Sequence, residues 1–149
     1  MLRVTKLTDY ATVVLTVLAA APERVHSAAE LAERAGLEVT TVAKLLKPLA
    51  QAGLVAGFRG AHGGYRLARE AQAISLVDIV EAMEGPLGMT ECSLHESNCG
   101  IESSCGVRAN WRRINDVVAD ALREVSLADM LSPTPIKSRR SIPATLATA

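Results

Sequence analysis

The stretch of sequence that decides the fold runs from Ser27 to Ala68 and reads SAAELAERAGLEVTTVAKLLKPLA followed by QAGLVAGFRGAHGGYRLA. Its first part places Ala32, Gly36 and Val42 at the spacing of a helix-turn-helix. In that motif a small residue lets two helices approach, a glycine forms the turn, and an apolar residue fills the interface. The spacing predicts a helix-turn-helix, with ordinary core packing of two helices as the alternative.

Two short helices flank Gly36 in this prediction. Ser27 and Glu30 match a capping box at the start of the first, and Gly36 is suited to end it in the left-handed conformation. Pro48 lacks a backbone N–H and disfavours helical geometry at the preceding residue, so we expect the next helix to kink or end early there. The apolar stripe of that helix consists of Val42, Leu45, Leu46 and Leu49.

The second part of the stretch predicts a β-hairpin. Two short apolar runs, 54–58 and 65–68, flank the glycine-rich segment 59–64, which is typical of paired strands joined by a tight turn. A helix-turn-helix that continues into a hairpin is the winged-helix arrangement of DNA-binding proteins. We therefore expect a mainly α fold: a winged helix-turn-helix with a small β-hairpin wing and a long C-terminal dimerisation helix.

Charge is distributed unevenly along the chain, although the formal net charge is zero. The segment 39–69 contains no Asp or Glu, whereas acidic residues outnumber arginines between residues 85 and 131. One basic face is what the neutralisation of DNA phosphates requires. The basic residues of the acid-free segment are Lys44, Lys47, Arg59, Arg66 and Arg69.

The predicted recognition helix supplies the first candidates for DNA contact. We expect Thr40, Thr41 and Lys44 nearest base edges or phosphates in the major groove, with Lys47 on the same face. The helix that follows Ser27 is suited to offer its N-terminus to a phosphate.

The predicted wing supplies the other candidates. Arg59 and His62 suit a neighbouring minor groove, where negative potential attracts arginine, and Gly63 and Gly64 allow a tight turn and close approach of the backbone. Each of these charged residues could instead be a solvated surface residue that does not contact DNA. We interpret Arg66 and Arg69 in this second way.

Periodicity extends the prediction to both sides of the winged helix. Apolar spacing predicts helices over 5–20 and 75–83. From Val107 onward, apolar residues recur every 3.5 residues on average, the seam of helices that pack side by side, with a core stripe inside one subunit as the alternative. The seam consists of Val107, Trp111, Ile114, Val118, Ala121 and Val125.

These segments divide the chain into four expected parts: a DNA-binding domain at 1–85, a cysteine-bearing loop at 86–106, a dimerisation helix with a short terminal helix at 107–131, and a disordered tail at 132–149.

No segment approaches the roughly 18 apolar residues of a membrane span, and the polar N-terminus is no signal peptide, so we expect a cytoplasmic protein. No phosphate loop or Ser/His/Asp set marks a catalytic site, so we expect no enzyme.

All three cysteines, Cys92, Cys99 and Cys105, fall within the predicted loop. Their spacing is wider than the C-x2-C pairs of structural zinc sites. An iron–sulfur cluster usually takes four ligands, so another residue type or another subunit must complete the set. From chemistry alone the alternatives are an iron–sulfur cluster, a zinc site, or redox-switching thiols. A cluster carrier is a further alternative, but it leaves the acid-free segment without a role.

Four motifs carry a resemblance to a known family: 5–11, 27–32, the wing 59–68, and the three cysteines ahead of a Trp-bearing helix. Over residues 1 to about 131 the chain resembles the IscR and NsrR type of iron–sulfur regulators, and it looks most like the branch that regulates the SUF iron–sulfur assembly system. The resemblance implies a homodimer, a [2Fe-2S] cluster or alternatively a [4Fe-4S] cluster, and repression of cluster-assembly genes through binding to double-stranded operator DNA.

The chain departs from one part of the family pattern. IscR-like members use a histidine three residues after the last cysteine as fourth ligand, and that position here is Arg108. NsrR-like members use an aspartate near the start of the first helix of the partner subunit, and the matching residue is Asp9. We expect Asp9 of the partner subunit to be the fourth ligand, with His95 and Glu102 as alternatives within the same chain. Asp9 could instead serve only to stabilise the positive N-terminus of its helix.

Ligation by Asp9 across a dimer would couple the two sites. Loss of the cluster would free the first helix, which is expected to pack on the helix-turn-helix, and so change the spacing of the two recognition helices. A symmetric dimer must meet the half-sites of a pseudo-palindromic operator about one helical turn apart, so spacing decides the fit.

Overall fold

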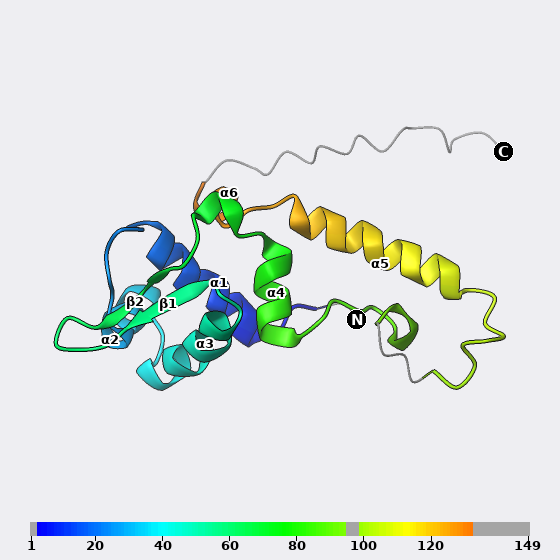
Figure 1. Cartoon of the computed structure of the whole chain (residues 1–149), viewed down its shortest axis with the longest axis horizontal. Helices are drawn as coiled ribbons and strands as arrows, with labels where there is room; N and C mark the ends of the chain where they lie inside the picture. Colours follow the sequence, from blue (N-terminus) through cyan, green and yellow to red (C-terminus); the bar gives the residue numbers. More distant parts are fainter. Residues whose placement is uncertain (1–2, 95–98, 133–149) are drawn as a thin grey trace.

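The computed structural model describes residues 3–94 and 99–132. Figure 1 shows one body and a helix that extends from it, with the cysteine-bearing loop at the far end of that helix. No helix in the described ranges combines the length and the apolar composition needed to cross a membrane. The elements are α1 (Lys6–Ala19), α2 (Ala28–Ala35), α3 (Val39–Gln51), β1 (Val55–Phe58), β2 (Gly64–Leu67), η1 (Ala71–Ala73), α4 (Leu76–Glu84), η2 (Glu91–Ser93), α5 (Arg108–Arg123) and α6 (Leu127–Leu131).

The predicted helix-turn-helix is formed by α2 and α3. The Ser27 hydroxyl accepts a hydrogen bond from the Glu30 N–H at 3.1 Å and so caps α2. Gly36 ends α2 with φ of 67°, the left-handed conformation that glycine adopts without a steric penalty. α1 packs against both helices, and the buried core between them includes Val14, Leu15, Leu18, Leu31, Ala32, Val42 and Leu45.

The predicted early end at Pro48 is wrong, because α3 continues through this residue to Gln51. Leu49 follows Pro48 and is fully buried. Leu45 and Leu46, on the turn before the proline, are at most 1% exposed. Burial of each leucine contributes about 1.5–3 kcal/mol, and a buried leucine beyond the proline requires the helix to continue. The packing of the last turn therefore offsets the hydrogen bond that the proline cannot donate.

The predicted hairpin is formed by β1 and β2, which pair antiparallel with Val55 opposite Leu67 and Phe58 opposite Gly64. The segment before α2 adds a third strand-like contact: the His26 N–H donates to the Tyr65 carbonyl at 2.9 Å, and the Tyr65 N–H donates to the His26 carbonyl at 2.7 Å. The wing is therefore attached to the entrance of α2.

The chain returns to the body after α5. Ser75 and Ser126 form an antiparallel bridge, and the Leu127 N–H donates to the Ile74 carbonyl at 2.7 Å. Ser126 and Asp129 form a capping box for α6, which packs on α1. Leu127 is fully buried, so this short terminal helix completes the core of the winged helix.

The C-terminus of α4 is tied to the start of α1 by Glu84. Its carboxylate accepts the Thr8 hydroxyl at 2.5 Å and the Thr5 N–H at 2.9 Å. These hydrogen bonds lower the pKa of Glu84 below its ordinary value, and the bond from the Thr8 hydroxyl has the largest effect. Since Gly85 begins the segment that leads to the cysteines, Glu84 connects that segment to α1.

Glu84→Gln is expected to lower the free energy of unfolding at neutral pH by at most about 1 kcal/mol, because water screens this exposed carboxylate. A carboxyl group with a lowered pKa in the folded state stabilises it above the ordinary pKa, and this contribution is lost as pH falls through the lowered value. Urea unfolding should show a difference between the two proteins at pH 7 that disappears in acid. A difference that is the same at both pH values would contradict this assignment.

Candidate nucleic-acid interface and cysteine loop

The outer face of α3 is polar and open. Thr40, Lys44 and Lys47 are exposed and Thr41 is half-buried, because the opposite face of α3 carries the buried leucines. Neither lysine forms an ion pair with a residue in the described part of the chain. The four predicted recognition residues therefore lie on one helix whose charge is not neutralised locally.

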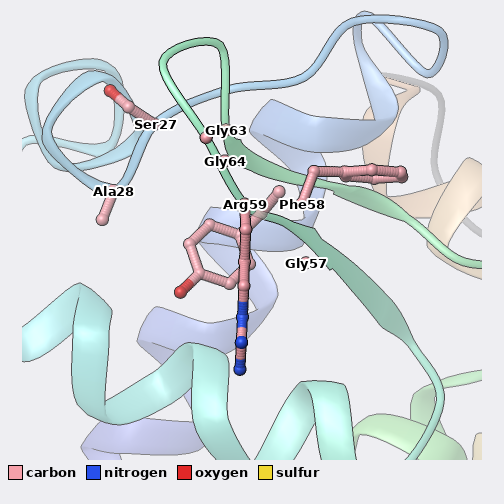
Figure 2. Close-up of a pocket in the computed structure, with 9 residues that line it drawn as sticks. Ser27, Ala28, Gly57, Phe58, Arg59, Gly63 and Gly64 are labelled. Carbon is pink, nitrogen blue, oxygen red and sulfur yellow. The ribbon is translucent and has the colours of Figure 1, made fainter.

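The wing and the start of α2 enclose a cavity of about 410 Å³, lined by Ser27, Arg59 and the wing glycines among others. Figure 2 shows the Arg59 and Phe58 side chains pointing away from each other, with Ser27 across the cavity from the hairpin. Arg59 and His62 are exposed, and neither forms an ion pair within residues 3–94 and 99–132.

The two arginines that we interpreted as surface residues have partners inside the fold. The Arg66 guanidinium lies 4.9 Å from the centre of the Phe58 ring. Arg69 lies 3.7 Å from the Asp78 carboxylate and donates to the Ala73 carbonyl at 3.4 Å. Of the other basic residues of segment 39–69, which are Lys44, Lys47 and Arg59, none forms an ion pair within the described residues.

Close packing explains the wing glycines. A Cβ atom on Gly64 would lie 2.3 Å from the His26 carbonyl oxygen, and one on Gly63 would lie 2.5 Å from the Phe58 carbonyl oxygen. Both glycines are therefore required by the packing of the wing itself, whether or not they also approach DNA.

The cysteines lie on the loop that leads into α5. Cys92 is in η2 and is buried, whereas Cys99 and Cys105 are half-buried, and none of the three forms a disulfide. The Cys92 sulfur lies 3.2 Å from the Thr90 hydroxyl. Arg112 of α5 donates from Nε to the Cys92 carbonyl at 3.0 Å, which fastens the start of the loop to that helix.

The end of the loop is fastened to α5 by charge. Arg108 pairs with Glu102 through Nη2, and Arg112 approaches the same carboxylate at 3.8 Å. The Nε of Arg108 is buried and has no acceptor in the described ranges. An unsatisfied buried donor costs about 1–3 kcal/mol, so this atom marks a place for an acceptor.

The donor chemistry of the loop fits an iron–sulfur cluster, because three cysteines that form no disulfide lie on one loop and such clusters are held by cysteine sulfur. The buried Arg108 Nε, three residues after Cys105 in the chain, is a donor suited to an anionic sulfur. Among residues 3–94 and 99–132, no group of three or more His, Cys, Asp and Glu side chains is gathered as metal ligands. His95 lies outside the described residues.

Asp9 is exposed in the first turn of α1. It lines a groove of about 780 Å³ between the start of α1, α4 and the ends of α5 and α6. Among the described residues, Asp9 is not gathered with the cysteines as a set of metal ligands.

α5 presents an apolar stripe that its own chain leaves open. Of its residues only Asn115 is buried, and Trp111, Ile114 and Val117 are 38%, 42% and 48% exposed. Ile114 and Val117 line a shallow groove on α5 itself. Val117 was missed by the 3.5-residue pattern, although its spacing of three from Ile114 places it on the same face. Asn115 accepts a hydrogen bond from the Met89 N–H at 3.1 Å and Arg112 donates to the Cys92 carbonyl, and no local pattern in the sequence indicated either contact.

Comparisons with known proteins agree with the winged helix-turn-helix fold. The chain matches the Rrf2 family, described as "Iron-dependent Transcriptional regulator", over residues 4–133. It is 35% identical to protein aau3 of Rhizobium meliloti over 90% of this chain and 88% of that protein. It is 30% identical to the HTH-type transcriptional regulator IscR of Vibrio vulnificus over 72% of this chain, and spans 64% of that regulator.

A solved structure shows the same architecture. CymR, described as the global cysteine regulator of B. subtilis, aligns with a TM-score of 0.69 and 31% identity over 91% of this chain and 100% of that chain. The winged helix-turn-helix and the mainly α fold predicted from the sequence are thereby confirmed. The family consists of DNA-binding transcription regulators and not of enzymes. The chain therefore belongs to the Rrf2 family of transcriptional regulators.

Proposed function

We propose that the protein represses iron–sulfur cluster assembly genes, and that it binds operator DNA as a homodimer whose affinity is set by an iron–sulfur cluster on Cys92, Cys99 and Cys105. The observation that carries this proposal is the combination of two features in one chain. Lys44 and Lys47 on α3 and Arg59 on the wing form no ion pair within the described residues, and three cysteines that form no disulfide lie on the loop that leads into α5.

In the proposed complex α3 enters the major groove. Thr40, Thr41 and Lys44 contact base edges or phosphates there, and Lys47 contacts the backbone. The wing then lies over the adjacent minor groove with Arg59 and His62, while Ser27 presents the N-terminus of α2 to a phosphate. The support for this placement is that the α3 residues and the two wing residues are exposed or half-buried, and that Lys44, Lys47 and Arg59 form no ion pair among residues 3–94 and 99–132.

Arg59→Ala is expected to weaken operator binding by about 1–3 kcal/mol, because a cation without an internal partner is removed from the wing. Fluorescence anisotropy at one fixed salt concentration measures the change. Arg66→Ala is the matched control: it removes the same charge from the same hairpin, but this guanidinium lies over Phe58. Equal losses in the two variants would show that Arg59 acts only through net charge.

The apolar stripe of α5 supports the homodimer. Large apolar side chains on one face of a helix favour burial against a second helix, and here the chain's own core leaves that face open. Two copies joined along α5 would carry two α3 helices to half-sites about one helical turn apart in a pseudo-palindromic operator.

The cysteine loop is the proposed sensor. A bound [2Fe-2S] cluster, or alternatively a [4Fe-4S] cluster, supplies a redox-sensitive, oxygen-sensitive crosslink between the thiolates. Cys92 is held in η2 against α5 by Arg112, and Cys105 lies just ahead of α5. The loop's own attachment to α5 thus links the state of the thiols to the dimerisation helix.

Asp9 of the partner subunit is the proposed fourth ligand. Its exposure on α1 leaves it accessible to a second chain, whereas the local alternative Glu102 is engaged by Arg108 and Arg112. Release of Asp9 on loss of the cluster would act on α1, which packs on α2 and α3.

Asp9→Ala is expected to leave cysteine ligation intact but to make the cluster decay at least several-fold faster in air, because one ligand is lost. Visible absorbance after anaerobic purification follows the decay. Glu23→Ala, which removes an exposed acid from the turn after α1, is the control. Unchanged absorbance and unchanged decay in Asp9→Ala would remove the basis for ligation across the dimer.

One experiment tests the proposed function as a whole. Protein purified anaerobically is analysed for iron, sulfide and zinc, and both the cluster-bound and the cluster-free forms are titrated with promoter DNA. We expect iron and sulfide in equal amounts and a different affinity in the two forms. Zinc in place of iron, or thiols that alone change the affinity on oxidation, would establish the alternative of a zinc- or thiol-based regulator. Failure of both forms to bind would leave the cluster-carrier alternative.

A further inference from the structure

The Arg108 guanidinium has one nitrogen in an ion pair and another nitrogen that is buried without a hydrogen-bond acceptor in the described part of the chain. The first is Nη2, which pairs with Glu102, and the second is Nε. Arg108 opens α5 three residues after Cys105. The orphaned donor therefore lies where the polypeptide passes from the last cysteine into the helix.

A second guanidinium stands one helical turn further along α5. Arg112 donates to the Cys92 carbonyl and also approaches Glu102. Together the two arginines hold the start of the loop at Cys92 and its end at Glu102. Two permanent positive charges face the one Glu102 carboxylate here, which leaves one positive charge in excess at the start of α5.

We propose that Arg108 is a hydrogen-bond donor to a sulfur atom of the cysteine-bound centre, and that it sets the reduction potential of that centre without ligating it. This inference rests on the proposed function, because it requires a cluster on the three cysteines. The planar guanidinium is suited to the task, since it donates from Nη2 to Glu102 and from Nε in another direction at the same time. An ammonium group at this position keeps the charge but lacks that fixed pair of donors.

The expected consequence follows from charge. Reduction adds one negative charge to the cluster, and hydrogen bonds and positive charge near the sulfurs favour the reduced form. Arg108 therefore raises the reduction potential, and it stabilises the cluster against loss by binding to the anionic sulfurs.

The test compares anaerobically purified full-length protein with Arg108→Gln and Arg108→Lys. Arg123→Gln is the matched control, because Arg123 lies on the same helix but pairs with Asp120. For each protein we would measure iron and sulfide content, midpoint potential by spectroelectrochemical titration, decay of visible absorbance in air, and thermal unfolding.

We expect Arg108→Gln to shift the midpoint potential to more negative values and to speed decay several-fold. Arg108→Lys should recover part of the shift, and Arg123→Gln should leave both readouts unchanged. Arg108→Gln with the potential and the decay rate of the original protein would overturn the inference, and so would an equal shift in Arg123→Gln. If Arg108→Gln does not fold, Arg108→Lys decides alone: an unchanged potential and decay rate overturn the inference. Absence of iron and sulfide from the original protein itself would overturn the proposed function as well, whereas an unaffected cluster in Arg108→Gln would overturn only this inference.

Discussion

Gly64→Ala is expected to abolish high-affinity operator binding and to lower the free energy of unfolding by about 3 kcal/mol. The added Cβ atom would lie 2.3 Å from the carbonyl oxygen and 2.6 Å from the carbonyl carbon of His26, and 3.0 Å from the Ser27 nitrogen. All three are backbone atoms, so no side-chain rotation relieves the contact. The backbone φ of +156° adds strain for any residue with a Cβ atom.

The strand must therefore move away from His26, which breaks the two hydrogen bonds that attach the wing to the entrance of α2. Arg59 would move with the wing while α3 stays in place, so the two elements that we propose to contact DNA would no longer match adjacent grooves. Urea unfolding and anisotropy with operator DNA measure the two effects.

Gly60→Ala is the matched control for this variant. Gly60 lies in the same hairpin with φ of +107°, but a Cβ atom there meets nothing within 4 Å. It should cost only backbone strain, about 1 kcal/mol. Equal stability losses in the two variants would show that strain, and not collision with His26, determines the requirement for Gly64.

The Gly64 contact also shows where sequence-based prediction reaches its limit. The glycine-rich run predicts a tight turn, and the structure has one. The partner that makes Gly64 necessary is His26, which is distant in sequence and carries no β-strand pattern of its own. A long-range backbone contact of this kind depends on how the hairpin packs on the helices, so the local apolar periodicity of the sequence does not predict it.

Local signals were sufficient for the helices, because caps and apolar stripes act within one or two turns. Ser27, Gly36, Ser75 and Ser126 end or begin helices as their chemistry predicts. Pro48 was misjudged because its local effect is outweighed by the burial of leucines against other elements. Propensity describes the isolated segment, whereas burial depends on the whole fold.

The sequence identifies the cysteines of the candidate site but not the residues that surround them. Three cysteines in one segment point to thiol chemistry from the sequence alone. The attachment of the loop through Arg108 and Arg112 depends on α5 lying alongside η2, and charged residues at helical spacing are ordinarily solvated. The family pattern marks Arg108 only as the place of a missing histidine ligand. The structure shows that Arg108 and Arg112 attach the loop, whereas Arg123 pairs with its own helix neighbour Asp120.

Ile114→Asp is expected to convert the proposed dimer to monomers and to weaken operator binding by about 100-fold or more, because a half-site must then be bound without the avidity of a joined partner. Ile114 is 42% exposed and lies at the centre of the open stripe with Trp111 and Val117. Symmetry places the new carboxylate twice in the interface, where burial of an unpaired charge is costly. Sedimentation velocity and anisotropy measure the two effects.

The helix itself should survive this change, because the α5 stripe contributes nothing to the core of its own chain and only Asn115 of α5 is buried. Thermal unfolding of the monomer should therefore remain cooperative. Ala109→Asp introduces the same charge on an exposed position of α5 away from the stripe, and it should remain a dimer. A dimeric Ile114→Asp that binds the operator normally would show that α5 is not the joining surface. The coupling of the cysteine loop to the spacing of the two α3 helices would then need another route, since that loop contacts α5 through Arg112 and Asn115.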